Sequence, residues 1–137
     1  MSKTIYWAIK LDSASKSLLL SKFPAKHPNV YAEHMTIIFR PSDKVDSELM
    51  NKCGLAVSIR VVGHAYDNNG QAVKVESDAV SKIGGGIPHI TISCASGTKP
   101  VYSNKLLAEG DNQVPTLVLT GIVARFTDKG WDTKSKE

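Results

Sequence analysis

The sequence contains two copies of one short pattern whose residue types could do chemistry. "HMTI" begins at His34 and "HITI" begins at His89, and in each a histidine is followed by an apolar residue, a threonine and a second apolar residue. Histidine is the side chain that gains and loses a proton near neutral pH, and a threonine hydroxyl can donate a hydrogen bond to an anion. The repeat therefore predicts a site built from two imidazoles and two hydroxyls.

Strand periodicity predicts how these polar groups are presented. In an extended strand, residues two apart point to the same face, about 6.5 to 7 Å from one another. His34 and Thr36 therefore project together, and so do His89 and Thr91, while the apolar residues of each pattern face the other way. If the two strands pack side by side, the four polar side chains converge without a carboxylate among them.

This set of groups suits hydrolysis of a phosphodiester. One histidine can take a proton from an attacking hydroxyl or water while the other gives a proton to the leaving oxygen. The threonine hydroxyls can donate to the non-bridging oxygens, where negative charge is stabilised in the transition state. The residues do not indicate which histidine is the acid and which is the base.

Other interpretations of the histidines are less favoured. Catalytic zinc takes three protein ligands, and the sequence has no HExxH or HxH arrangement, so we expect no metal and no cofactor. The "GGG" at 84–86 is not a phosphate-binding P-loop, because no Gly-Lys-Ser/Thr follows it. We expect His27, which lies near two prolines, and His64 to be structural or surface residues.

The composition is that of an ordinary globular domain. The 137 residues, 42% hydrophobic and 22% charged, predict one domain over 1–137. No apolar run reaches the roughly 18 residues of a membrane span, and the first residues lack the layout of a signal peptide, so we expect a cytoplasmic protein without membrane contact. A net charge of +4 permits a nucleotide or RNA partner without demanding one. Cys53 and Cys94 are expected to be reduced and buried.

Periodicity and end signals predict mixed secondary structure of the α+β class, with two strand-and-helix halves and hairpin strands between them. Asp12 and Ser42 are helix-capping types, and "DNNG" is a hairpin turn signal. A flexible tail is expected from about residue 129 to 137. In order, we expect a strand over 4–11, a helix over about 13–23, a strand over 34–40, a helix from 42 to 53, hairpin strands over 55–67 and 71–77, a strand over 89–95, a short helix starting near Ser103, and a long strand over 116–128.

With one in each half of the chain, "HMTI" and "HITI" resemble the paired HxTx motifs of the two-histidine (2H) phosphoesterase superfamily. "WAIKLD", "EHMTIIFRPSD" and "HITISCASGTKPVYSNKLL" are most similar to the cyclic phosphodiesterase domain of fungal and plant tRNA ligases and to small stand-alone RNA-repair-like relatives, some from phages. The resemblance covers about residues 4 to 126. It implies a bilobal, pseudo-symmetric fold of antiparallel sheets with flanking helices, whose central cleft holds both HxTx strands.

The resemblance also implies residue roles. By position, His34 and His89 match the acid/base pair, and Thr36 and Thr91 match the hydroxyls that bind the phosphate. From strand faces and from position after the second motif, further substrate contacts are expected from Tyr6, Lys10, Arg40, Lys99, Tyr102 and Lys105.

The activity implied is that of a hydrolase, a metal-independent cyclic phosphodiesterase. It would convert the 2′,3′-cyclic phosphate of an RNA end or nucleotide to a phosphomonoester. In tRNA ligases this domain is joined to kinase and ligase modules, so RNA kinase or ligase proteins are expected partners in RNA repair. Two alternatives stay open, namely a phage-type hydrolase of cyclic oligonucleotide defence signals and a non-catalytic module that binds a nucleotide or RNA end.

Overall fold

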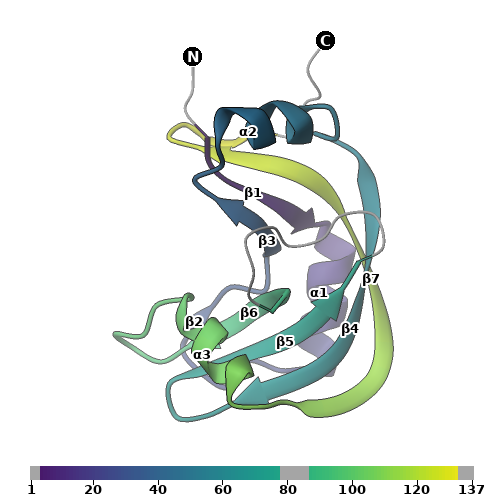
Figure 1. Cartoon of the computed structure of the whole chain (residues 1–137). Helices are drawn as coiled ribbons and strands as arrows, with labels where there is room; N and C mark the ends of the chain where they lie inside the picture. Colours follow the sequence, from purple (N-terminus) through teal and green to yellow (C-terminus); the bar gives the residue numbers. More distant parts are fainter. Residues whose placement is uncertain (1–3, 78–86, 133–137) are drawn as a thin grey trace.

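The computed structural model describes residues 4–77 and 87–132, which form strands and three short helices (Figure 1). The elements are β1 (Thr4–Leu11), α1 (Ser13–Lys22), β2 (Asn29–Val30), β3 (His34–Phe39), α2 (Asp43–Met50), β4 (Ala56–Tyr66), β5 (Gly70–Glu76), β6 (His89–Cys94), α3 (Tyr102–Ala108), β7 (Asn112–Thr127) and β8 (Gly130–Asp132).

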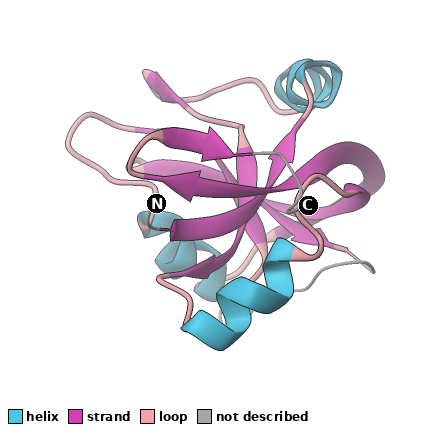
Figure 2. Ribbon diagram, turned by 90° about the horizontal axis from the view of Figure 1, so that it is seen from above, coloured by secondary structure: helices cyan, strands magenta, loops and turns pink. Residues whose placement is uncertain are grey.

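The strands form one antiparallel sheet that closes on itself. The hydrogen-bonded order is β1-β3-β6-β5-β4-β7, and β7 also pairs with β1, so these six strands make a closed barrel. The short strands β2 and β8 pair with β6 and β7 at its rim. Figure 2 shows the helices outside the strands. This architecture of antiparallel strands and separate helices is compatible with the predicted α+β class.

Local signals placed the helices correctly. The Asp12 carboxylate accepts a hydrogen bond from the Ser15 backbone N–H at 2.7 Å and caps α1, and Ser42 caps α2 in the same way. α2 ends at Met50, however, and not at the predicted Cys53. The backbone N–H of Cys53 bonds the carbonyl three residues back, because the chain leaves the helix in tight turns.

The predicted strand faces are confirmed at the two motif strands. Met35 and Ile37 of β3 and Ile90 and Ile92 of β6 are fully buried in the barrel core, whereas the intervening polar residues are partly exposed. In β1 the predicted core residues Trp7 and Ile9 are buried, but Ala8 on the opposite face is buried too. Both faces of β1 are therefore covered at its centre, whereas Tyr6 and Lys10 are only partly buried.

The C-terminal end differs from the prediction. β7 begins at Asn112, four residues before the predicted start, and the predicted flexible tail contains strand β8. β8 is held because Arg125 on β7 forms an ion pair with Asp132 at 2.6 Å and the Thr127 hydroxyl donates to the Gly130 carbonyl. Residues 133–137 and the glycine-rich link at 84–86 lie outside the described residues.

β2 was not predicted from the sequence, because a strand of two residues is too short to give a periodic signal. Cys53 and Cys94 are buried and carry no disulfide, as predicted. Within residues 4–77 and 87–132, none of the helices has the length and apolar character needed to cross a membrane.

Candidate active site

The two strands that carry the HxTx motifs, β3 and β6, are neighbours that share a single pair of register partners. Met35 of β3 lies opposite Ile90 of β6, and both side chains are fully buried. Away from this point β3 pairs with β1, and β6 pairs with β5. The motif strands are therefore joined at one apolar contact and separate beyond it.

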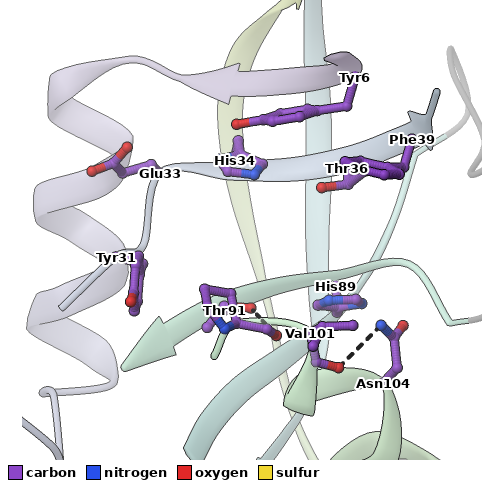
Figure 3. A pocket seen from close by; sticks show the side chains of 11 residues that line it. Tyr6, Tyr31, Glu33, His34, Thr36, Phe39, His89, Thr91, Val101 and Asn104 are labelled. Carbon is purple, nitrogen blue, oxygen red and sulfur yellow. Dashed lines mark hydrogen bonds between the residues drawn. The ribbon is translucent and has the colours of Figure 1, made fainter. Parts of the chain in front are cut away.

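This register fixes the arrangement of the four polar residues. Antiparallel partners are counted in opposite directions, so His34 lies opposite Thr91 and Thr36 lies opposite His89. Each histidine thus faces the threonine of the other motif, and the two histidines lie on a diagonal, an arrangement close to two-fold symmetry (Figure 3). We call these four residues the tetrad.

The tetrad lines one pocket of about 520 Å³ between the two strands and the start of α3. This size lies within the range of small-molecule sites. The structure therefore brings the four residues named from the sequence together in one cavity. The residues that line it are Tyr6, Tyr31, Glu33, His34, Thr36, Phe39, His89, Thr91, Pro100, Val101 and Asn104.

His34 lies against aromatic side chains. Its ring stacks on Tyr6 with 5.2 Å between ring centroids, and the Trp131 ring meets it edge-on at 5.6 Å. Its Nδ1 atom is buried and has no hydrogen-bond partner. Burial, and secondly the charge of His89, lowers the pKa of His34 to about 4. The imidazole of His34 is therefore neutral at pH 7.

His89 is held by a backbone contact. Its Nδ1 donates to the carbonyl oxygen of Ile87 at 2.7 Å. In the neutral ring this bond leaves the lone pair on Nε2, and in the charged ring it stabilises the proton on Nδ1. Nε2 is thus the nitrogen of His89 that exchanges a proton.

Thr91 is oriented by the segment that leads into α3. Its hydroxyl lies 2.8 Å from the hydroxyl of Ser103, which is buried, and 3.3 Å from the carbonyl oxygen of Pro100, to which it donates. A hydroxyl has one proton, so Thr91 can donate to a ligand only by giving up the Pro100 carbonyl. Ser103 can then donate to the Thr91 oxygen and keep that side chain in place.

Of the six further substrate contacts predicted from the sequence, only Tyr6 is among the described residues that line the pocket. Burial, and secondly the charge of Glu33, raises the pKa of Tyr6 to about 12, so its hydroxyl stays protonated. Its ring also stacks on Phe126. Lys10, Arg40, Lys99, Tyr102 and Lys105 are not among the lining residues, and a direct role for them stays a prediction.

Arg40 was predicted to share a strand face with His34, because the two residues are an even number of positions apart. A bulge in β3 changes this alternation. β1 residues Trp7 and Ala8 pair with Ile38 and Thr36, so Ile37 is an extra residue in β3. Phe39 consequently joins the lining of the pocket, and Arg40 leaves the strand with φ 53° and its guanidinium over the Phe39 ring.

Tyr102 makes a structural contact with the hairpin turn. Its hydroxyl donates to the carboxylate of Asp67, which also accepts from the backbone N–H groups of Asn69 and Gly70 in the hairpin turn. This contact anchors the start of α3 to the hairpin. The Lys105 ammonium lies 5.9 Å from the centre of the Tyr102 ring.

Several residues around the tetrad were not predicted from the sequence. Tyr31 and Glu33 directly precede the first motif, and their adjacency to it was the available signal. Phe39 and Val101 are large apolar residues that remain 57% and 69% exposed at the pocket, which no local pattern indicates. Trp131 lies in the segment that was expected to be a flexible tail.

No family model matches the sequence, and no curated protein matches it significantly. In the part of the chain that the structure describes, no group of three or more His, Cys, Asp or Glu side chains could hold a metal ion.

The low pKa of His34 predicts a specific dependence of stability on pH. Because its pKa is below the ordinary value of 6.5, His34 contributes stability fully above pH 6.5, and this contribution is lost as the pH falls towards 4. The free energy of unfolding is measured with urea at pH 7.5 and at pH 4.5 for the wild type and for His34→Asn. Between these pH values, the free energy of unfolding of the wild type should fall by about 1 kcal/mol or more beyond the fall seen for His34→Asn.

Apart from His89, whose charge is coupled to that of His34, the other titrating groups are common to both proteins, so their effects cancel in this comparison. Equal losses of unfolding free energy in the two proteins would show that His34 is not held neutral by the fold.

Proposed function

We propose that the protein is a metal-independent phosphodiesterase that hydrolyses the 2′,3′-cyclic phosphate of an RNA end or nucleotide to a phosphomonoester. The observation that carries this proposal is the convergence of the tetrad in one pocket, with the two histidines on a diagonal. In-line displacement at phosphorus places the attacking and leaving oxygens on opposite sides. The base and the acid must then also lie on opposite sides of the phosphate, and a diagonal pair supplies that arrangement.

We assign His34 as the base and His89 as the acid. The depressed pKa of His34 favours a neutral ring that can accept a proton, while the Ile87 carbonyl accepts from Nδ1 of His89, so that the proton His89 donates is the one on Nε2. His34 takes a proton from water as the water oxygen bonds to phosphorus. His89 gives its Nε2 proton to the ribose oxygen as the phosphorus–oxygen bond breaks. The hydroxyls of Thr36 and Thr91 donate to the two non-bridging oxygens.

Substrate binding adjusts the base. A phosphodiester carries one negative charge, and an anion beside an imidazole raises the pKa of that imidazole. The pKa of His34 therefore rises from about 4 towards neutrality when the substrate occupies the pocket. This rise makes His34 a stronger base at the moment when a base is needed.

The proposal includes the bilobal architecture of the 2H superfamily. β3 and β6 would belong to different lobes, and the pseudo-two-fold axis would pass between Met35 and Ile90. The single register pair between these strands supports this division, because a cleft can open where two strands separate. The enzyme would work in the cytoplasm beside an RNA kinase or ligase.

The first test is hydrolysis of adenosine 2′,3′-cyclic phosphate in the presence of EDTA. The expected product is adenosine monophosphate. His34→Ala and His89→Ala should each lower kcat by a factor of about 10² to 10⁴, the range for loss of a general acid or base. His27→Ala is the matched control, because His27 does not line the pocket and should retain activity.

Full activity in the double variant His34→Ala/His89→Ala, or loss of wild-type activity with EDTA, would contradict the proposal. Tight nucleotide binding without turnover would identify a binding module. Adding 3′,5′-linked and 2′,5′-linked cyclic oligonucleotides to the same assay tests whether defence signals are the preferred substrates.

Ser103 is predicted to be a positioning residue that acts through Thr91. Ser103→Ala removes the donor to Thr91, so the Thr91 hydroxyl should stay on the Pro100 carbonyl instead of turning to the phosphate. We expect kcat to fall about tenfold with little change in KM, since the hydrogen bond that is lost acts mainly in the transition state. Ser103→Thr keeps the hydroxyl and should restore kcat.

Unfolding of the Ser103 variants by urea shows whether they are folded under assay conditions. An unchanged kcat in folded Ser103→Ala, or a failure of Ser103→Thr to restore it, would remove Ser103 from the mechanism.

A further inference from the structure

The segment just before the first motif contains two residues more than the strand that it faces. Val30 pairs with Ser93 and Met35 pairs with Ile90. Five residue steps from Val30 to Met35 therefore correspond to three residue steps along β6. Ala32 lies in this segment with φ 55°, a conformation that residues with a Cβ rarely adopt, and it is fully buried. Unfavourable backbone conformations of this kind are often found at functional sites.

The extra residues bridge the gap between the separating strands. The backbone N–H of Tyr31 donates to the Ile92 carbonyl on β6 at 2.8 Å, and the Glu33 carbonyl accepts from Leu11 on β1 at 2.8 Å. Both side chains line the pocket. Figure 3 shows Tyr31 and Glu33 on one side of the tetrad, with Phe39 and Asn104 on the other side.

Glu33 is unusual for a pocket that takes an anion. Among the described residues that line the pocket, Glu33 is the one carboxylic acid, and none of these lining residues is a lysine or an arginine. A carboxylate repels a phosphate, so Glu33 favours poses in which the phosphate lies away from it. Its partner Lys16 is 3.7 Å away, and the two side chains are 41% and 47% exposed, so this ion pair is weak. The carboxylate oxygens can therefore accept hydrogen bonds from a ligand.

We propose that Tyr31 and Glu33 form a nucleobase subsite that prefers guanine. The inference rests on the proposed function, because it places the phosphate on the tetrad and the base beside it. The Tyr31 ring offers a face on which a base can stack. The Glu33 carboxylate accepts two hydrogen bonds side by side, and guanine presents two neighbouring donors, its N1–H and its 2-amino group.

The other bases fit this carboxylate less well. Adenine and cytosine each present an amino donor next to a ring nitrogen that is an acceptor, and uracil presents one N–H between two carbonyl oxygens. In each case a lone pair would face a carboxylate oxygen, which is repulsive. The preferred substrate is thus guanosine 2′,3′-cyclic phosphate or an RNA end that terminates in guanosine.

The test measures kcat/KM for the 2′,3′-cyclic phosphates of guanosine, adenosine, cytidine and uridine. The wild type should prefer guanosine by about tenfold or more, as expected for a bidentate contact to a base. Glu33→Gln replaces one acceptor by a donor, which matches the edge of adenine, so the ratio of guanosine to adenosine rates should fall by a similar factor. Tyr31→Ala should raise KM for all four nucleotides.

Lys16→Ala is the matched control. It removes the ion-pair partner of Glu33 but does not change a residue that lines the pocket, so the preference for guanosine should remain. Equal rates for the four nucleotides in the wild type, or an equal loss for all four in Glu33→Gln, would overturn the subsite. An equal loss would point to a contact with a group that all four share, such as the 5′-hydroxyl.

A binding measurement separates failure of the subsite from failure of the proposed function. If none of the nucleotides is hydrolysed, calorimetry with guanosine 3′-monophosphate and adenosine 3′-monophosphate is carried out on the wild type and Glu33→Gln. Selective binding of the guanosine compound that is lost in Glu33→Gln supports the subsite although the diesterase proposal has failed. Equal binding of the two compounds, or no binding, overturns the subsite.

Discussion

The contact between Met35 and Ile90 is the constraint on which the candidate active site depends. These two buried side chains are the one register pair between the motif strands, and the tetrad consists of the residues before and after each of them. A shift of one residue in this pairing would move an apolar side chain into the pocket on one strand. The barrel core thus sets the relative positions of His34 and His89, although the two motifs are far apart in the sequence.

Burial then sets the electrostatic character of the site. His34 lies against Tyr6 and Trp131, and its neutral state follows from desolvation by burial together with the nearby charge of His89. His89 instead has the Ile87 carbonyl as a hydrogen-bond acceptor. Two side chains of the same type therefore have different surroundings, and an acid and a base that work at the same pH require such a difference.

Much of the fold follows from local patterns, because strand alternation, helix caps and the hairpin turn depend on residues close in sequence. The polar face of each motif and the caps Asp12 and Ser42 were predicted in this way. The bulge at Ile37 was not predicted, because it arises from the pairing of β3 with β1. As a result of this bulge Phe39 lines the pocket, where Arg40 was expected.

The two extra residues before His34 and the strand that carries Trp131 also depend on pairing between distant segments. No local sequence pattern reports that pairing. The residues that surround the tetrad were therefore harder to predict than the tetrad itself.

The most direct test of the central claim is the pH dependence of kcat/KM and kcat for a 2′,3′-cyclic nucleotide. Acid/base catalysis by the two histidines predicts bell-shaped profiles, because one histidine must be neutral while the other is protonated. The acidic limb of kcat/KM reports the free enzyme, in which the pKa of His34 is low. It should lie at lower pH than the acidic limb of kcat, since an anion bound beside an imidazole is expected to raise the pKa of that imidazole. Rates that do not change between pH 4 and pH 9 would contradict the assignment of both histidines.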